Sequence, residues 1–454
     1  MISKQKALPV TASKRPGERR LLPFLCIALI LCLVSATGVV AAGPRVLTLD
    51  DALAIADGRN REILKAKEFY NVVEGRYVEE RSAALPQLTL NGQLSRQDDQ
   101  SQKAYGGFFP TQQDIRGAEV DLSQALFTWG KVGAAIRAAE KGFQTADERL
   151  RTARQETRRD VSVAYYNILL ARERHAIASQ DLAQKVRHQD EAQRKHAAGV
   201  ATDYDVLAAG VALDNAMPDV IRAGNDIRST LDRLRYLLAL DEEIDVQGTL
   251  ETPLTSSPSY EQAVAVARER RPELQELRRR LEIAGELVKI ANADDKPRLD
   301  LKGGYGWRQL EAGDARGDGQ FWSVGLHLSF PFFDGLKTRG KVVQAESERR
   351  SLQIDEAKLL DSFSLEIRNA VNAVREAEEI VKALSGTVVQ AERLLVMAEK
   401  GYELGVKIRL EVDDAEFNLR QARGNLARAR RDYLVARVNL ERVMGVLGEE
   451  GRSN

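Results

Sequence analysis

The sequence predicts a mainly α-helical, exported protein that is internally duplicated and carries a few membrane-type β-strands. Three observations support this prediction. One phrase of the chain recurs about two hundred residues later, two long segments lack proline and are rich in helix formers, and four short segments alternate apolar with polar side chains. Strong helix formers favour helices, and a period of two is typical of strands.

The first 42 residues are predicted to be a secretory signal peptide. Six basic residues precede an apolar run over 21–40, and Val40-Ala41-Ala42 offers a small-residue cleavage site. Cleavage removes six of the 67 basic and one of the 67 acidic residues, leaving a net charge of about −5 and no basic excess for nucleic acid. Both cysteines, Cys26 and Cys32, lie in the signal peptide, so the mature chain can form neither disulfides nor a thiol site. An uncleaved anchor is the alternative.

The second part of the chain repeats the first. Residues 122–240 align with residues 328–446 at a constant shift of 206, and residues 49–92 align with residues 260–303 at a shift of 211. A polar stretch between the copies is typical of a linker. The predicted organisation is a signal peptide over 1–42, a first repeat over 43–240, a linker over 241–258, a second repeat over 259–447 and a C-terminal tail over 448–454.

Each repeat is predicted to hold a long helical hairpin. Residues 131–196 and 337–402 would form rods about 100 Å long at 1.5 Å per residue. Gly199 and Gly405 stand where each rod must reverse, which suits a left-handed C-cap. In the second repeat, apolar residues alternate steps of three and four, the heptad seam of a coiled coil. The seam consists of Val374, Ala377, Val381, Leu384, Val388, Ala391, Leu395, Ala398 and Tyr402, and then of Val412, Ala415, Leu419, Ala422, Leu426, Ala429, Tyr433, Ala436, Leu440 and Val443.

The strands are predicted at about 87–97, 116–124, 298–308 and 320–330. Apolar side chains on one face, polar ones on the other and aromatic residues near the ends are typical of membrane barrels. Four strands cannot close a barrel, whose smallest members have about eight, and open edges in lipid are costly. A membrane role therefore requires several copies, and the alternative is a soluble sheet.

These features together resemble the TolC-like outer-membrane efflux protein family. The resemblance covers residues 47–447 and rests on the opening LTLDDALAIADGRNREIL, on SQALFTWGK and SFPFFDGLK before the rods, and on the doubled glycine-led turns. It implies a homotrimer whose twelve-stranded barrel, with four strands from each chain, continues as a long α-helical coiled-coil tunnel in the periplasm. Loops 97–115 and 309–319 would then face the exterior.

The function implied by this resemblance is that of an exit duct in the Gram-negative outer membrane. The duct would serve a tripartite efflux or type I secretion system, passing substrates outward from the periplasm or from an inner-membrane pump. Its partners would be two further chains in a homotrimer, outer-membrane lipid, a periplasmic adaptor protein and, through the adaptor, the pump. We expect no nucleic-acid partner, because the mature chain carries no basic excess.

The resemblance also assigns residues around the hairpin turns. Asp205, Tyr402 and Lys407 would form the periplasmic gate, and lysine, which lacks the planar fork of arginine, should make a looser latch than the family's arginine. Thr128 stands in the first repeat where Asp334 stands in the second, so we expect it to cap its helix. The remaining assignments are an acidic entrance ring of Glu411 and Asp414, adaptor-contacting tips at Gly199, Val200, Gly405 and Val406, and a strand-to-helix passage at Thr128, Pro331 and Asp334.

No motif in the sequence supports catalysis, so we predict neither an enzyme nor a cofactor. His188 and His196 lie eight residues apart on one rod without a carboxylate at metal-site spacing, and we interpret them as exposed structural histidines. Two other functions stay open: a soluble periplasmic coiled-coil scaffold, which salt or alkali would wash off membranes, and an exported metal- or ligand-binding protein, which would bind saturably without conducting ions.

Overall fold

The computed structural model describes residues 45–101 and 110–448. The chain divides into two units, Met1–Arg45 and Val46–Asn454, and the second holds the helices and the larger sheet. The predicted signal peptide lies outside the described residues, as do parts of the first exterior loop and of the tail. Among the described helices, none is both long and apolar enough to cross a membrane.

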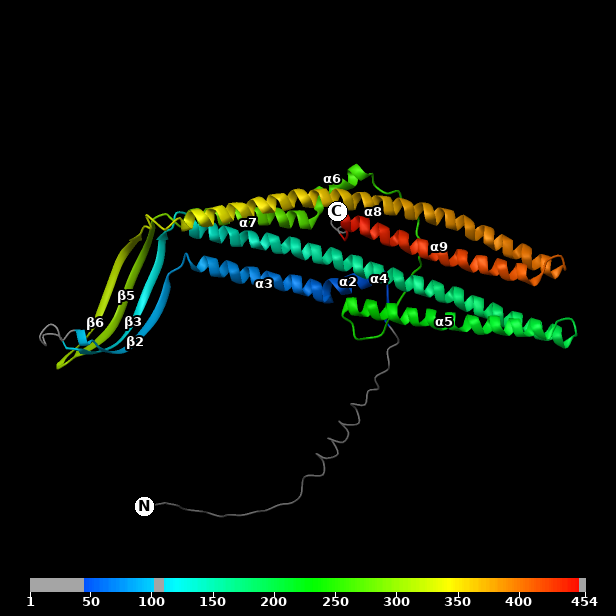
Figure 1. Cartoon of the computed structure of the whole chain (residues 1–454), viewed down its shortest axis with the longest axis horizontal. Coiled ribbons are helices and arrows are strands. Elements are labelled where there is room, and N and C mark those ends of the chain that lie inside the picture. Colours follow the sequence, from blue (N-terminus) through cyan, green and yellow to red (C-terminus); the bar gives the residue numbers. More distant parts are fainter. Residues whose placement is uncertain (1–44, 102–109, 449–454) are drawn as a thin grey trace, which may run out of the picture. The chain divides into compact units, whose positions relative to one another are not determined.

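Two pairs of long helices form the frame of the second unit (Figure 1). Helix α4 (Lys131–Ala197) runs back as α5 (Asp203–Leu238), and this pair is called the first hairpin. Helix α8 (Lys337–Glu403) runs back as α9 (Arg409–Val443), the second hairpin. Each rod ends within one residue of its predicted boundary, because strong helix formers fill it without a proline.

The seam predicted from the heptad pattern lies between α8 and α9. Small alanines alternate with larger apolar residues along it, so α9 packs closely against the part of α8 from Val374 to the turn. Its residues fall into three buried clusters, which include Val374, Ala377, Val381, Leu426, Ala429 and Tyr433 in the middle, then Ala391, Leu419 and Ala422, and finally Ala398, Val412 and Ala415 next to the turn.

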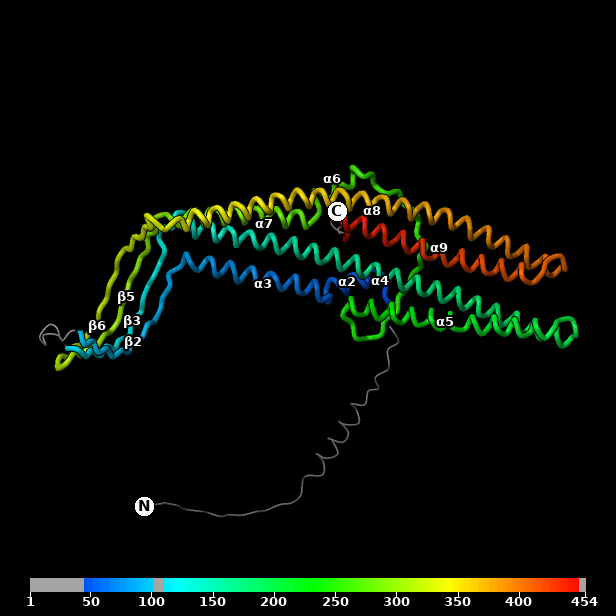
Figure 2. The backbone as a smooth tube through the Cα atoms, viewed as in Figure 1, coloured from blue at the N-terminus to red at the C-terminus, as the bar shows by residue number. Residues whose placement is uncertain are grey.

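Shorter elements precede the strands in each repeat. They are α2 (Leu49–Arg59) and α3 (Arg61–Ser82) in the first repeat, α6 (Tyr260–Arg270) and α7 (Pro272–Asn292) in the second, and the short strands β1 (Arg45–Leu47) and β4 (Ile244–Val246). The path of the chain through them can be followed in Figure 2. Elements β1, α2 and β4 cover an apolar core around Ile168 of α4 and Leu238 of α5. Helices α6 and α7 cover a second core around Ile367 of α8 and Tyr433 of α9.

One antiparallel sheet of four strands lies at the end of the hairpins opposite their turns (Figure 1). Its order is β2 (Gln87–Asp98), β3 (Gln112–Phe127), β5 (Arg298–Ala312) and β6 (Ala315–Ser329), so the inner pair β3–β5 joins the two repeats. The register gives the sheet one apolar face, made by Leu88, Leu90, Leu94, Val120, Leu122, Leu299, Leu301, Tyr305, Trp307, Trp322, Val324, Leu326 and Leu328.

The prediction of a loop over 309–319 was wrong. Strands β5 and β6 continue through this segment and are joined by the two-residue turn Gly313-Asp314, in which Gly313 has a φ of +59°. An ion pair between Glu311 of β5 and Arg316 of β6, 3.3 Å apart, links the two strands beside the turn. Beyond Trp307 both faces carry polar side chains, so the alternation that indicates a strand is lost while the backbone pairing continues.

Candidate functional site at the ends of the two hairpins

The two hairpins reverse direction with the same backbone motif. Gly199 and Val200 donate their N–H groups to carbonyl oxygens three and five residues earlier, at 2.8 and 2.9 Å. Gly405 and Val406 do the same at 3.1 and 2.9 Å. Both glycines are left-handed, with φ of +78° and +72°, a conformation that strains other residues. The repeated phrase of the sequence is therefore the C-cap of each rod.

The first turn of each returning helix is closed by an acidic side chain. Asp205 accepts hydrogen bonds from the backbone N–H and the hydroxyl of Thr202, both at 2.8 Å, and these bonds hold the pKa of Asp205 below its usual value. Glu411 accepts from Lys407 Nζ at 2.5 Å and from the N–H of Ile408 at 3.1 Å, and Lys407 is the main cause of its lowered pKa.

Within one chain, the three predicted gate residues are not brought together. Asp205 bonds to its own capping residue and Lys407 to Glu411, and the described residues contain no Lys407–Asp205 ion pair. The phenol oxygen of Tyr402 instead accepts a hydrogen bond from Lys195 Nζ of α4 at 3.1 Å. Sequence analysis missed Lys195, although its place in the last turn before Gly199 could have indicated a residue close to the hairpin turns.

The two residues predicted for the entrance ring lie in the first two turns of α9. Both side chains are exposed, and they stand three residues apart, so they share one side of the helix. The Glu411 carboxylate is paired with Lys407, whereas the side chain of Asp414 makes no ion pair or hydrogen bond with any residue in the described part of the chain.

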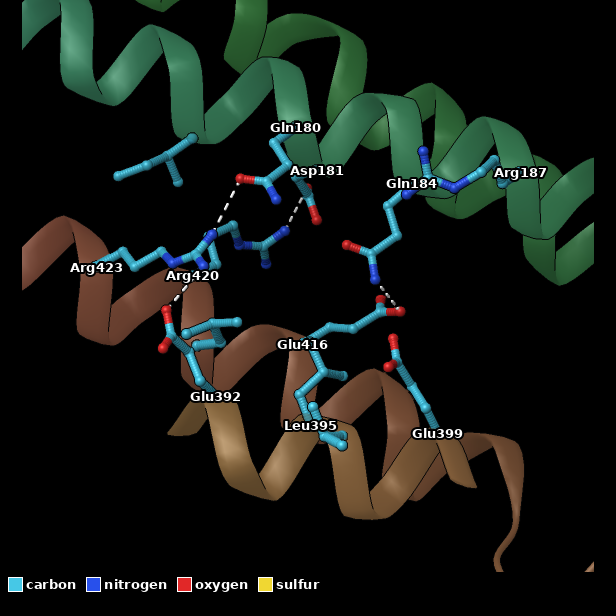
Figure 3. Close-up of a pocket in the computed structure, with 13 residues that line it drawn as sticks. Gln180, Asp181, Gln184, Arg187, Glu392, Leu395, Glu399, Glu416, Arg420 and Arg423 are labelled. Carbon is cyan, nitrogen blue, oxygen red and sulfur yellow. Dashed lines mark hydrogen bonds and ion pairs between the residues drawn. The ribbon is translucent and has the colours of Figure 1, made fainter. Parts of the chain in front are cut away.

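A buried carboxylate lies between the hairpins, behind the turns. The Glu416 side chain of α9 is only 3% exposed, and it is bonded by Lys185 Nζ at 2.8 Å and by His188 Nε2 at 3.1 Å, both from α4. Gln184 Nε2, also of α4, donates a third bond to it at 2.5 Å (Figure 3). Burial raises the pKa of Glu416, but the bonds from His188 and Lys185 outweigh burial and hold it below its ordinary value. Glu416 is therefore ionised at neutral pH.

The sequence analysis did not identify Glu416, and its interpretation of His188 was wrong. His188 is not an exposed histidine, because its side chain is only 18% exposed and its Nε2 donates a hydrogen bond to the buried Glu416 carboxylate. Glu416 directly follows Ala415 of the heptad seam, and such flanking positions carry interhelical ion pairs in coiled coils. That position is the signal that could have found it.

Three possible metal ligands meet at this cluster. Atoms of His188, Asp413 and Glu416 lie within 4.8 Å of one another. However, Lys185 Nζ is 3.8 Å from Asp413, and the Arg409 guanidinium is 3.2 Å from the same carboxylate. The positive charges of Lys185 and Arg409 already compensate the carboxylates of the cluster. They would also repel a divalent metal ion bound a few ångströms away. The chemistry of the cluster is that of an ion-pair network.

The strand-to-helix passages use equivalent caps in the two repeats. The Thr128 hydroxyl accepts from the N–H of Val132 at 3.3 Å, and the Asp334 carboxylate accepts from the N–H of Thr338 at 2.7 Å. Thr128 caps α4 from two residues outside the N-cap position, which Gly130 occupies. Before each rod the chain turns through two consecutive left-handed residues, namely Trp129 and Gly130 in the first repeat and Gly335 and Leu336 in the second.

Pro331 follows the last strand by two residues. It lines a cavity of about 590 Å³ at the passages, together with Thr128. Asp294, in the same cavity wall, accepts a hydrogen bond from Lys131 Nζ at 2.5 Å and is also bonded by Lys341. One carboxylate thus ties the starts of both rods together.

A four-stranded antiparallel sheet attached to two long helical hairpins defines the class of TolC-like outer-membrane channels, and comparison with known proteins agrees. The family model described as "Outer membrane efflux protein" matches residues 52–240 and 263–446. The chain belongs to the outer membrane efflux protein family. This membership confirms the resemblance found in the sequence and places the protein in the outer membrane, as an exit duct for efflux or secretion.

Individual relatives cover most of the chain. The outer membrane protein TolC of Vibrio cholerae is 24% identical over 382 residues, which are 82% of this chain and 84% of that protein. The alkaline protease secretion protein AprF of Pseudomonas aeruginosa is 28% identical over 387 residues, with coverages of 81% and 78%. The solved outer membrane channel CmeC of Campylobacter jejuni has a TM-score of 0.75 at 17% identity, with coverages of 88% and 85%, and thus shares the fold. These relatives are channel or secretion proteins rather than enzymes.

Proposed function

We propose that three copies of this chain form one continuous duct across the outer membrane and into the periplasm. The observation that carries the proposal is a sheet with one apolar face and two open edges, β2 and β6. Unpaired strand edges are not tolerated in lipid, and pairing β2 of one copy with β6 of the next removes them. Three sheets of four strands give a twelve-stranded barrel, above the minimum of about eight.

The hairpins continue this barrel as a coiled-coil tunnel. Three large apolar side chains on α5, Leu207, Val211 and Ile221, are 69%, 52% and 69% exposed in the single chain. Exposed apolar residues along one helix favour burial against another helix, and a neighbouring copy supplies one. The seam between α8 and α9 gives each chain its own two-helix segment of the tunnel wall.

The hairpin turns form the periplasmic mouth. Asp205, Tyr402 and Lys407 act as its gate, with Lys407 reaching Asp205 in the assembled ring rather than within one chain. Glu411 and Asp414 supply six carboxylates around the constriction of a trimer, which favours cations. The tips Gly199, Val200, Gly405 and Val406 dock the periplasmic adaptor, through which the inner-membrane pump delivers substrate. Val200 and Val406 suit docking because they are 75% and 77% exposed.

The test uses the full mature protein. Alkaline extraction of membranes should leave it in the pellet, detergent should release it, and light scattering of the detergent-solubilised protein should give the mass of three chains. Reconstitution in planar bilayers should give small, cation-preferring conductance steps. A soluble periplasmic scaffold would instead leave the membrane in alkali and run as a monodisperse single chain without detergent, which would overturn the proposal.

A further inference from the structure

The segment that leads from β6 into α8 exposes an unusual share of large apolar side chains. We call residues 330–336 the second corner. Within it, Phe330, Phe332, Phe333 and Leu336 are 56%, 88%, 76% and 63% exposed. Single exposed apolar residues are ordinary, but four within seven residues form a patch that favours an apolar partner. No segment in the described part of the chain covers this patch.

The equivalent segment of the first repeat, residues 124–130, shows on which side of the sheet such a corner lies. Phe127 is opposite Leu299, which belongs to the apolar face of the sheet. The ring of Trp129 contacts that of Phe127 edge to face, with the centroids 5.3 Å apart. Phe330 directly follows β6, in step with the apolar side chains of that strand. The corners therefore extend the apolar face, which meets lipid in the proposed barrel.

Two cations, Lys337 and Arg339, follow the second corner. Both are exposed, and neither side chain forms an ion pair or a hydrogen bond with any residue that the structure describes. In the first repeat Lys131 occupies the position of Lys337, and it pairs with Asp294 at 2.5 Å. Lys341 bonds the other oxygen of that carboxylate, so Asp294 has no oxygen left for Lys337. The second corner thus carries two positive charges that the folded chain does not neutralise.

We propose that the second corner binds an anionic phospholipid of the inner leaflet of the outer membrane. The phosphate and headgroup lie against Lys337 and Arg339, and the acyl chains lie against Phe332 and Leu336. The proposal rests on the barrel proposed above, because the barrel brings the corner to the membrane surface. It adds a preference for one class of lipid to the proposed function.

The order of the residues matches the order of the layers in a bilayer leaflet. Along the chain, the apolar face of β6 is followed by aromatic residues and then by cations, as the acyl chains are followed by the interface and the phosphates. Long basic side chains lay their stems along apolar surface and keep their charge at the headgroups. A zwitterionic lipid brings its own positive charge and compensates the two cations less well.

The acid of the corner does not compete for these cations. The Asp334 carboxylate accepts the N–H of Thr338 at 2.7 Å and is held in place as the cap of α8. The charge of the surface next to the patch is therefore set by Lys337 and Arg339. This complementarity favours an anionic lipid over an apolar surface of another copy of the chain.

The experiment measures which lipid the purified full-length mature protein retains in a non-ionic detergent. Phosphatidylglycerol and phosphatidylcholine with the same acyl chains are added separately, and native mass spectrometry counts the bound lipids. Phosphatidylglycerol should be retained about tenfold or more over phosphatidylcholine, since each basic residue at an anionic headgroup contributes about fivefold. Lys337→Gln with Arg339→Gln should abolish this preference. Lys358→Gln with Arg375→Gln, which removes two other exposed charges of α8, is the matched control and should keep it.

A second variant tests the apolar half of the site. Leu336→Gly with Phe332→Ala should lower the retention of both lipids severalfold and leave their ratio unchanged. Glycine suits this position, because Leu336 has a φ of +68°. Inorganic phosphate should displace no more phosphatidylglycerol than chloride of equal ionic strength does. Complete displacement by inorganic phosphate would show a phosphate site and overturn the lipid as its occupant.

The outcomes separate this proposal from the duct. If the Lys337 and Arg339 double variant keeps the same lipid preference as the control double variant, the lipid site is overturned, even in a protein that conducts ions. A parent protein without any preference overturns it as well. If the preference is lost only in the Lys337 and Arg339 variant while the parent neither forms trimers nor conducts, the lipid site stands and the duct proposal fails.

Discussion

Asp205 and Glu411 occupy the same position in the two hairpins. Each is the third residue of its returning helix, and each carboxylate accepts the backbone N–H of the residue three positions earlier, at 2.8 and 3.1 Å. Only the second hairpin adds a cation, since Lys407 bonds to Glu411. This duplicated position therefore caps the returning helix in both repeats, but only in the second repeat does it also form an ion pair. The first two predictions test these two roles in turn.

Replacing Asp205 distinguishes its role as the cap of α5 from its proposed role in the gate of the channel. Asp205→Ala should lower the stability of the first turn of α5 by about 1 kcal/mol, because it removes one half of a capping box. It should also raise single-channel conductance in planar bilayers if Asp205 latches the mouth. Thr202→Ala is the control, since it removes the other half of the box and keeps the carboxylate. Equal conductance changes in both variants would assign the effect to the cap alone.

Lys407→Glu should raise conductance more than any conservative change at the same position. The new carboxylate would stand beside that of Glu411, which Lys407 now pairs at 2.5 Å, and like charges repel. Lys407→Arg keeps the positive charge and should leave the mouth closed or close it further, because arginine offers a bidentate donor. Conductance of Lys407→Glu that matches the parent protein would remove Lys407 from the gate.

The entrance ring predicts ion selectivity. Glu411→Gln combined with Asp414→Asn should weaken the preference for cations, because both carboxylates lie exposed on one side of α9. The measurement is the reversal potential under a salt gradient, which should move toward zero. Glu243→Gln, an exposed acid of the linker, should leave it unchanged. An unaltered reversal potential in the double variant would contradict the ring.

Acid should weaken the bonds between Glu416 and its partners on α4. The pKa of Glu416 is depressed in the folded protein below its ordinary 4.5, so its stabilising contribution is fully present above 4.5. The contribution is lost as the pH falls through the lower folded pKa, because the protonated carboxyl cannot pair with Lys185. The apparent melting temperature of the parent protein should therefore fall as the pH drops below 4.5. In Glu416→Gln it should start low, and a pH curve identical to that of the parent would contradict the prediction.

The turn glycines should resist substitution. Gly199→Ala and Gly405→Ala should each cost about 1–2 kcal/mol, because alanine is strained in the left-handed conformation even where space is free. Gly424→Ala, inside α9 with no atom near the added methyl group, should instead stabilise by about 0.5–1 kcal/mol. Limited proteolysis at the turns and apparent melting temperatures distinguish the two directions.

The sequence predicted the rods and the turns because their signals are local. Helix-forming composition set the ends of α4 and α8, and glycine marked the reversals. The Lys195–Tyr402 bond and the Glu416 cluster were not predictable in the same way, since they depend on which face of α4 meets the second hairpin. The ends of β5 and β6 were missed because the apolar alternation stops at Trp307 while the backbone pairing goes on.

The corners that lead from strand to rod place a bulky residue where glycine is the usual choice. Trp129 and Leu336 both adopt a positive φ, and their side chains are 53% and 63% exposed. In the proposed barrel these corners lie at the inner surface of the bilayer, where tryptophan prefers to reside. Each subunit thereby carries two exposed apolar side chains at one level, so these corners, and not the helices below, set how deep the proposed barrel sits in the membrane.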